Sequence, residues 1–294
     1  MTAPTSFTEL VGCAAPIQQA PMGSVSTPDL AVAVADAGGV GTITALGMPT
    51  EVLDRVLSEM SSRTTGTLAA NFLTDQIDPD AVAAAGAHVR IVDFFWTDPD
   101  PSLVEIAHRA GALACWQVGS VDEAKAAADA GCDVVVAQGT EAGGHVRGYT
   151  PLLPLLRSVL EAVTVPVVAA GGIGDAAAFA SVLAEGAAGA RIGTRFAATE
   201  ESGAHPEYKR AIVDAAADST EITDAFAVCP LCATVPRARV LRSCIDALHH
   251  LDTDEAVRAC SADSTSRSRR DTVCRRGPQR PVTSTRWRCT PASP

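Results

Sequence analysis

A histidine follows a buried strand and a glycine-rich turn in the middle of the chain. The run Val134–Gln138 is apolar and β-branched, as buried strands are, and the segment Gly139–His145 contains three glycines and ends in one imidazole. Glycine lets the backbone approach a ligand closely, and histidine is the side chain most easily tuned to transfer a proton near neutral pH. We therefore single out His145 as a candidate catalytic base. An exposed histidine in a tight turn is the alternative interpretation of the same pattern.

Two more glycine turns follow later apolar runs. Gly171–Gly174 comes after the strand-like segment Val165–Ala170, and Gly193 and Thr194 come after Gly189–Ile192. At these positions of a barrel, backbone N–H groups and a helix N-terminus commonly bind a phosphate group. We expect Gly171, Gly172, Gly193 and Thr194 to contribute to such a cradle.

The two turns also limit the chemistry. Neither contains a lysine, and the chain has no G-x-x-x-x-G-K-[ST] motif, which argues against nucleotide hydrolysis. Asp175 directly precedes a predicted helix, so we expect it to be an N-cap and not a catalytic acid.

Strand-like and helix-like segments alternate along the chain with a period of about 20 to 30 residues, which favours βα units around a parallel sheet. Eight strands and seven intervening helices predict an α/β fold of the (β/α)8 TIM barrel type. An open doubly wound sheet is the main alternative, although the first strand is not followed by G-x-G-x-x-G. The predicted strands are Pro16–Ala20, Val40–Ala45, Thr67–Leu73, Val89–Trp96, Ala112–Val118, Val134–Gln138, Val165–Ala170 and Gly189–Ile192.

The C-terminal third has a different pattern. We expect Pro206–Ala217 to be the eighth helix and Pro236–Leu248 to be a short helical extension. Residues 259–294 are rich in Ser, Thr, Arg and Pro and show no periodicity, so they are predicted to be an irregular tail. The predicted domains are thus a barrel over residues 1–258 and a basic, poorly ordered tail over residues 259–294.

Charge and composition exclude several classes of protein. The net charge is −11, and the eight arginines and two acidic residues of the tail leave −17 on residues 1–258. Such an acidic body repels nucleic acid, and we favour a tail without fold, or one translated out of frame, over a nucleic-acid-binding tail. No apolar stretch of 18 residues predicts a membrane span, and no signal peptide is found.

Cysteine and histidine usage indicates reduced thiols and no metal site. The nine cysteines are odd in number and scattered, which suits a cytoplasmic protein. We interpret Cys229-Pro-Leu-Cys232 as chance spacing, with zinc or redox chemistry as the less favoured alternative. His88 and His108 lie on separate predicted elements and lack acidic partners at metal-ligand spacing.

Uncharged residues, three of which are amides, lie at or just after the ends of several predicted strands. Met22, Asn71, Gln117 and Gln138 would line a ring held across the barrel mouth. Amides suit a flavin, whose ring edge carries alternating hydrogen-bond donors and acceptors. Taken singly, Asn71 and Gln138 could also be ordinary polar residues at strand ends.

These motifs together resemble the nitronate monooxygenase family, formerly called 2-nitropropane dioxygenases. The similarity runs from Pro16 to about Leu248, and the segment Gln138–His145 is its most specific part. The segments that carry it are Pro16–Gly23, Asn71–Phe72, Ala137–His145, Ala170–Gly174 and Gly193–Phe196.

The resemblance implies a TIM barrel with non-covalently bound FMN and His145 as the catalytic base. Met22, Asn71, Gln138, Gly143, Gly172, Gly193 and Thr194 are implied to touch the flavin. With the neighbouring turn and strand-end residues, the candidate cofactor-binding set is Met22, Gly23, Asn71, Gln117, Gln138, Gly143, Gly144, Gly171, Gly172, Gly193 and Thr194.

The implied reaction is the oxidation of an alkyl nitronate. The nitronate passes one electron to FMN, O2 then reacts, and a carbonyl compound and nitrite are formed. For a neutral nitroalkane, His145 would first remove the α-proton. The expected partners are this small substrate and O2, with no nucleic acid and no membrane, in a monomer or homodimer.

Three other functions stay open. An FMN-dependent enoyl-[acyl-carrier-protein] reductase would share the Gly-Gly-His turn but use a nicotinamide. Family members usually carry more ordered sequence after the counterpart of Val240–Leu248, so this chain could bind flavin without turnover. A phosphosugar- or nucleotide-binding barrel without redox chemistry is the third.

Overall fold

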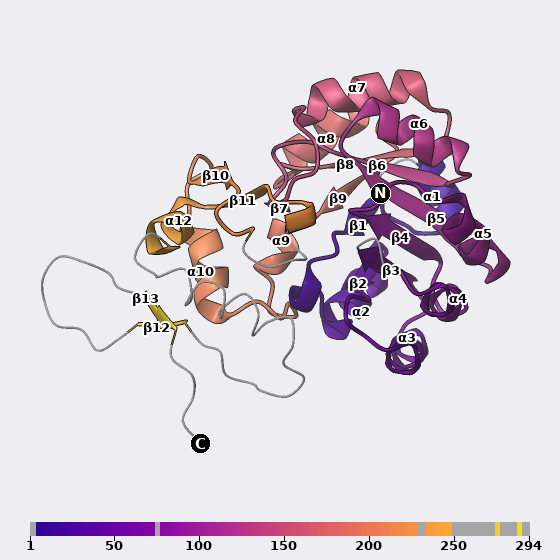
Figure 1. The fold of residues 1–294 in the computed structure, drawn as a ribbon, viewed down its shortest axis with the longest axis horizontal. Coiled ribbons are helices and arrows are strands. Elements are labelled where there is room, and N and C mark those ends of the chain that lie inside the picture. The colour runs from indigo at the N-terminus through magenta and orange to yellow at the C-terminus, as the bar shows by residue number, and fades with distance from the viewer. Residues whose placement is uncertain (1–3, 74–76, 228–232, 249–273, 277–286, 290–294) are drawn as a thin grey trace, which may run out of the picture. The chain divides into compact units, whose positions relative to one another are not determined.

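Eight parallel strands close into a barrel, which confirms the predicted TIM barrel (Figure 1). The computed structural model describes residues 4–73, 77–227, 233–248, 274–276 and 287–289. The strand order around the barrel follows the chain, with the first strand pairing with the last. The barrel strands are β1 (Ile17–Gln19), β2 (Val40–Thr44), β3 (Thr67–Leu73), β4 (Ile91–Phe95), β5 (Leu113–Val118), β6 (Val134–Gln138), β8 (Val167–Ala170) and β9 (Gly189–Ile192).

Seven helices connect consecutive barrel strands within the described residues and cover the outside of the barrel (Figure 1). Parallel strands covered in this way are buried on both faces, which explains why they are continuous apolar runs in the sequence. The connecting helices are α2 (Pro28–Asp36), α3 (Thr50–Arg63), α4 (Pro79–Gly86), α5 (Pro101–Arg109), α6 (Val121–Asp129), α7 (Leu152–Ala162) and α8 (Ala176–Ala184).

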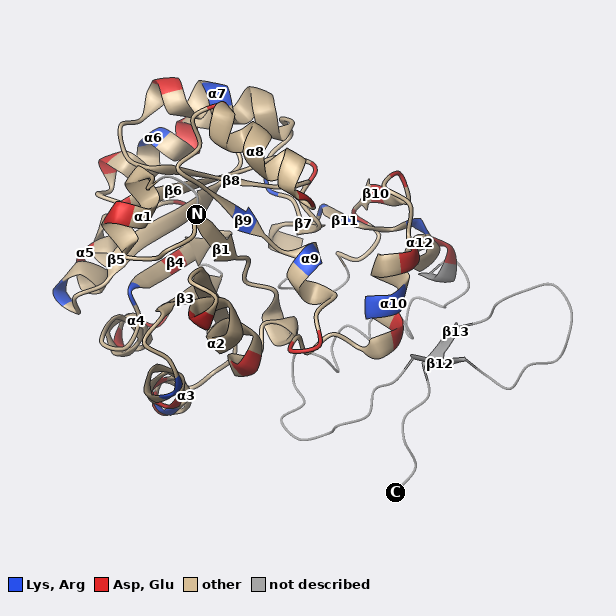
Figure 2. Cartoon of the chain, turned by 180° about the vertical axis from the view of Figure 1, so that it is seen from behind, with Lys and Arg blue, Asp and Glu red and all other residues tan. Residues whose placement is uncertain are grey.

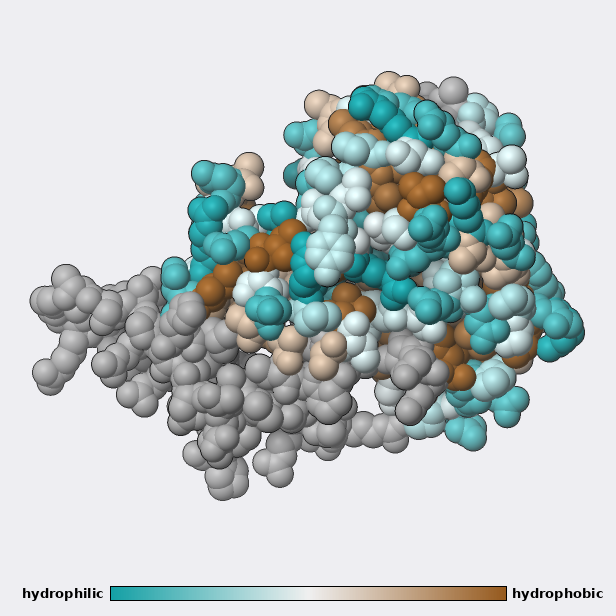
Figure 3. Space-filling model, turned by 45° about the horizontal axis from the view of Figure 1, so that its top comes forward, coloured by the Kyte–Doolittle hydropathy of each residue, from teal (hydrophilic) through white to brown (hydrophobic). Residues whose placement is uncertain are grey.

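The core lies in two layers. Between the barrel and its helices, Leu53, Leu57 and Met60 of α3 are fully buried in the same cluster as Phe94 and Trp116, whose rings stack with centroids 4.6 Å apart. On the outer surface of the helices, Figure 3 shows apolar residues in separate groups between hydrophilic ones. This is the pattern of helices that bury one face only.

A short helix that the sequence analysis missed closes the N-terminal end of the barrel. Helix α1 (Ser6–Val11) buries Phe7 and Val11 in the inner cluster, against the first residues of several strands such as Val40 and Ile91. Thr5 caps this helix, and its hydroxyl also donates to the carbonyl of Ala188 at 2.6 Å. The helix is only six residues long, which is too short for a helical pattern to be recognised in the sequence.

The barrel belongs to the first of two compact units, residues 1–214, which ends with α10 (Pro206–Asp214). The second unit begins at Ala215, and the boundary predicted from the sequence lay after residue 258. Residues Thr220–Thr223 (β10) and Ala238–Leu241 (β11) form an antiparallel pair there, and α12 (Arg242–Leu248) follows.

The prediction for the segment after Pro236 is wrong in part. The helix expected over Pro236–Leu248 begins only at Arg242, because the residues before it pair with the β-branched strand β10. A strand partner about 20 residues away overrides a local helical pattern.

Most of the predicted tail and the Cys229-x-x-Cys232 motif lie outside the described residues. The part of the tail that is described consists of β12 (Cys274–Arg276) and β13 (Trp287–Cys289), which pair antiparallel. No helix in the described part of the chain is long and apolar enough to cross a membrane.

Candidate functional site

The glycine turns predicted from the sequence lie next to one another at the carboxyl ends of the strands. A Cβ atom on Gly143 would come within 2.7 Å of the Thr194 hydroxyl oxygen, and one on Gly193 within 3.7 Å of the Met22 sulfur. A Cβ on Gly171 would lie 2.9 Å from the backbone nitrogen of Ala142. The turns after β1, β6, β8 and β9 thus converge at one rim of the barrel. Glycines stand where these turns approach one another most closely, because a side chain would not fit there.

The turn after β8 has a backbone conformation that requires glycine. Gly171 has φ +118° and Gly172 has φ +68°, both in the region that other residues avoid. Helix α8 starts directly afterwards, and the Asp175 carboxylate accepts a hydrogen bond from the N–H of Ala178 at 2.8 Å. Asp175 is therefore the N-cap that the sequence predicted.

Gln138, predicted to face a flavin, holds the histidine turn in place. Its Nε2 donates to the His145 carbonyl at 2.9 Å, and its Oε1 accepts from the N–H of Arg147 at 3.2 Å. His145 itself lies in the two-residue strand β7 (Gly144–His145), where Gly144 has φ +73°. The amide at the end of β6 therefore fixes the backbone directly after the candidate base, from the His145 carbonyl to the Arg147 N–H.

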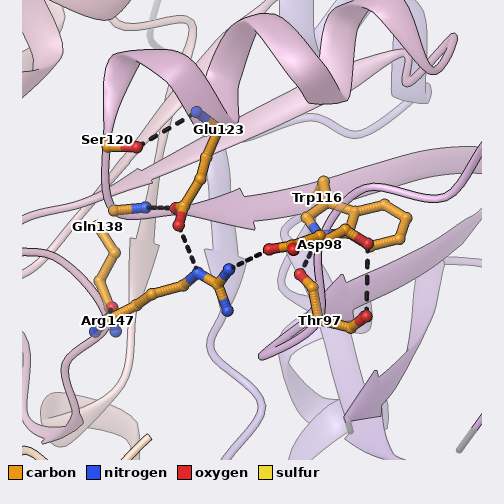
Figure 4. A network of polar contacts seen from close by, with 8 residues as sticks. Thr97, Asp98, Trp116, Ser120, Glu123, Gln138 and Arg147 are labelled. Atoms are coloured by element: carbon orange, nitrogen blue, oxygen red, sulfur yellow. Dashed lines mark hydrogen bonds and ion pairs between the residues drawn. The ribbon is translucent and has the colours of Figure 1, made fainter. Parts of the chain in front are cut away.

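Arg147 ties the same turn to the first turn of α6 and to the loop after β4 (Figure 4). Its Nε donates to Glu123 at 2.7 Å, and its terminal nitrogen donates to Asp98 at 2.8 Å. The other Glu123 oxygen accepts from the N–H of Gly119 at 2.7 Å, while the Ser120 hydroxyl accepts from the N–H of Glu123. Ser120 thus caps α6, and the Glu123 side chain joins Arg147 to the backbone of Gly119.

Trp96, which follows β4, was not predicted as a site residue. Its ring packs against the imidazole of His145, with centroids 4.6 Å apart and planes inclined by 76°. Among the described residues it is the only one other than glycine with positive φ, at +76°. Nothing in the sequence signals this conformation, because tryptophan at a strand end usually has extended backbone.

An ion pair is buried inside the barrel, beneath the predicted site. Arg191 of β9 donates to Asp93 of β4 at 2.5 Å, and their side chains are 1% and 0% exposed. Asp93 lies in β4 and Arg191 in β9, whereas Figure 2 shows many of the charged residues on the surrounding helices. Burial disfavours the charged form of Arg191, but Asp93 and Cys115 together leave the pKa of Arg191 above its ordinary value.

The same pair orients the two other amides of the predicted site. Arg191 donates to the Gln117 oxygen at 2.8 Å, and the Asn71 amide nitrogen donates to Asp93 at 2.6 Å. The Asn71 oxygen is buried and has no hydrogen-bond partner among the described residues. The Asn71 side chain is therefore fixed through its nitrogen, while its oxygen can still accept a hydrogen bond from a ligand.

Asp93 and Arg191 were not predicted as site residues. The available signal was a charged residue in the middle of each apolar strand, since such a residue requires a buried partner. Across the part of the chain that the structure describes, no group of three or more His, Cys, Asp or Glu residues could hold a metal ion. His88 and His108 instead pair with Asp54 and Asp133, each at 2.8 Å.

Comparisons with known proteins agree with this arrangement. The family model described as nitronate monooxygenase matches residues 5–87 and 71–244. Nitroalkane oxidase from Streptomyces ansochromogenes superimposes with a TM-score of 0.72 at 32% identity, covering 89% of each chain. FabK from Thermotoga maritima superimposes with a TM-score of 0.76 at 32% identity, covering 87% of this chain and 81% of that one.

A relative with a different activity is also similar. The (3aS,4S,5R,7aS)-5-hydroxy-7a-methyl-1-oxo-octahydro-1H-indene-4-carboxyl-CoA dehydrogenase of Rhodococcus jostii is 38% identical over 200 residues. The match covers 67% of this chain but only 56% of that enzyme. The chain thus spans little more than half the length of this relative.

Proposed function

This chain belongs to the nitronate monooxygenase family, and from this premise we propose that it oxidises an alkyl nitronate, with FMN as cofactor and O2 as oxidant. The products would be a carbonyl compound and nitrite. The observation that carries the proposal is the convergence of the His145 turn with two glycine turns at one rim of the barrel.

The glycine turns fit the phosphate end of FMN. Gly171, Gly172, Gly193 and Thr194 would supply backbone N–H groups there, next to the start of α8. A side chain at Gly143 would collide with Thr194, and one at Gly171 would collide with Ala142. The proposed phosphate cradle therefore requires glycine at both positions.

The strand ends fit the flavin ring. The partnerless Asn71 oxygen supplies an acceptor, and Gln117, whose oxygen is bound by Arg191, would present its amide N–H groups. Met22, Gly23, Gly143 and Gly144 would complete the lining, and Gln138 contributes by holding the His145 turn. Bound there, FMN supplies the electron-accepting chemistry that the protein's own side chains lack.

His145 would act as a general base toward a neutral nitroalkane. It would accept the α-proton and so generate the nitronate that the reaction consumes. A substrate added as the nitronate has already lost that proton, so the two substrate forms separate proton transfer from the later steps.

The test uses the purified chain with FMN and a His145→Gln variant. We expect a flavin absorption spectrum, O2 uptake and nitrite release with both substrate forms. His145→Gln should lower the rate with the neutral nitroalkane by about 10²- to 10⁴-fold and affect the nitronate much less. Equal rates of the two proteins with the neutral nitroalkane would contradict the role of His145. Absence of a flavin spectrum would contradict the cofactor and favour a phosphosugar-binding barrel.

A second candidate function follows from the Rhodococcus jostii relative, whose name specifies a carboxyl-CoA dehydrogenase. The same site would then oxidise a CoA thioester. Anaerobic mixing distinguishes the candidates, because only the true substrate bleaches the bound flavin. NADH and NADPH in the same experiment test the enoyl-reductase alternative.

A further inference from the structure

Trp96 has a backbone conformation that its surroundings must enforce. A tryptophan at φ +76° is a steric outlier, and such residues cluster at functional sites, where neighbouring structure holds them. Its indole Nε1 is buried without a hydrogen-bond partner among the described residues, which adds a second cost to this position. Two unfavourable features at one residue call for a compensating role.

The residues after Trp96 are held by two contacts (Figure 4). The carbonyl of Thr97 accepts from the indole N–H of the buried Trp116 at 3.2 Å, and Asp98 accepts from Arg147 at 2.8 Å. Arg147 is in turn anchored by Glu123 at 2.7 Å. The loop after β4 is therefore fixed to the core on one side and to the His145 turn on the other.

The ion pair between Asp98 and Arg147 follows the contact between the Trp96 and His145 rings by the same number of residues in both segments. Asp98 lies two residues after Trp96, and Arg147 lies two residues after His145. The bond between Asp98 and Arg147 thus joins the two segments just beyond the point where the rings of Trp96 and His145 meet, with centroids 4.6 Å apart.

We propose that Trp96 is a positioning residue for His145, held against the imidazole by the ion pair between Asp98 and Arg147. The indole limits the rotation of the imidazole, so that the ring nitrogen stays aligned for proton transfer. This catalytic consequence rests on the proposed role of His145, whereas the ring contact itself does not.

The first experiment tests the contact and requires neither flavin nor substrate. The Trp96 emission is obtained as the difference between the wild-type protein and Trp96→Phe, and it is followed from pH 5 to pH 8. A protonated imidazole in contact quenches indole emission, and histidine titrates in this range. We expect a sigmoidal change in the wild-type protein and none in His145→Gln. A flat Trp96 emission in the wild-type protein would overturn the proposal.

The second experiment separates the ring from the strained backbone. Trp96→Phe keeps a ring, Trp96→Ala removes it at positive φ, and Trp96→Gly removes it and relieves the backbone. With the neutral nitroalkane, we expect kcat to fall by about 10- to 100-fold in both Ala and Gly variants, since small misplacements of a reacting group cost this much. KM should change little, Trp96→Phe should stay near wild type, and the nitronate should be less affected. Full activity of Trp96→Ala, or rescue by Trp96→Gly, would overturn the positioning role.

The two experiments fail in different ways. Wild-type protein that does not turn over nitronates contradicts the proposed function, and the emission experiment then still decides whether Trp96 contacts His145. Flavin content and far-UV circular dichroism, measured for every variant, identify a variant that has lost its fold. In that case the emission of the wild-type protein and His145→Gln decides the proposal.

Discussion

Two ion pairs in the barrel unit have opposite surroundings. Asp93 and Arg191 are fully enclosed by the strands, whereas Asp98 is 92% exposed where it meets Arg147 at the rim. A buried charge without its partner is strongly destabilising, while an exposed pair adds little to stability. From this comparison we expect that neither charge of the inner pair can be removed alone without loss of stability, and that the outer pair acts by placing the loops it joins and not by stabilising the fold.

The largest effect is expected from breaking the inner pair. Arg191→Met leaves the Asp93 carboxylate buried and unpaired, which should lower the free energy of unfolding by about 3–5 kcal/mol. Urea unfolding followed by circular dichroism measures this loss. The double variant Asp93→Leu/Arg191→Met removes both charges and should be more stable than the single variant. If Arg191→Met lowers the free energy of unfolding by less than about 1 kcal/mol, the inner pair contributes no more to stability than an exposed ion pair does, and the prediction is wrong.

The buried region should also respond to alkaline pH. Burial raises the pKa of the Cys132 thiol from 9.0 to about 12, with the nearby carboxylates of Asp133 and Asp93 adding to the rise. The thiol ionises first in the unfolded chain, so its contribution to stability is complete below pH 9 and is lost as the pH rises toward 12. The expected slope is about −1.4 kcal/mol per pH unit. Urea unfolding between pH 8 and pH 11 should show a shallower decline in Cys132→Ala, and identical slopes would contradict this assignment.

An intermediate effect is expected in the glycine turn after β8. Gly171→Ala places a Cβ at φ +118° and 2.9 Å from the Ala142 nitrogen, so it should cost about 1–3 kcal/mol and weaken FMN binding. Gly174→Ala is the matched control in the same turn, because its Cβ would meet nothing within 4 Å. Thermal unfolding and FMN titration compare the two. Equal affinities would argue against a phosphate cradle at Gly171.

The smallest stability effect should come from the outer pair. Asp98→Asn is expected to change the free energy of unfolding by less than about 1 kcal/mol but to lower kcat with the neutral nitroalkane. Glu105→Gln removes another exposed ion pair, with Arg109, and should leave kcat unchanged. If both variants keep full kcat, the outer pair has no positioning role.

The fold was predictable because the apolar runs of a covered parallel barrel are unmistakable. Thr67–Leu73 and Gly189–Ile192 were predicted with the bounds they have in the structure. Helix α1 was missed because six residues carry little periodicity, and β11 was missed because its partner strand, and not its own sequence, determines its conformation.

The site was predictable in its backbone turns but not in its contacts. Glycine in Gly171–Gly172 signals unusual backbone, and both residues do have positive φ. The partner of Asp93 lies 98 residues away, and no local pattern points to it. The positive φ of Trp96 left no trace in the sequence either, because the contacts around it, such as the ion pair between Asp98 and Arg147, join segments that are 49 residues apart in the chain.

The first and last strands of the barrel lie side by side, and this has a consequence for biosynthesis. Ile17 of β1 is in register with Ala190 of β9, and Thr5 bonds to Ala188 across 183 residues of chain. A ribosome must therefore release most of the unit before the ring can shut. Phe7 and Val11 pack against residues of strands that are synthesised much later, so this helix is among the last parts of the barrel unit to reach its final place, although it precedes the barrel strands in the chain.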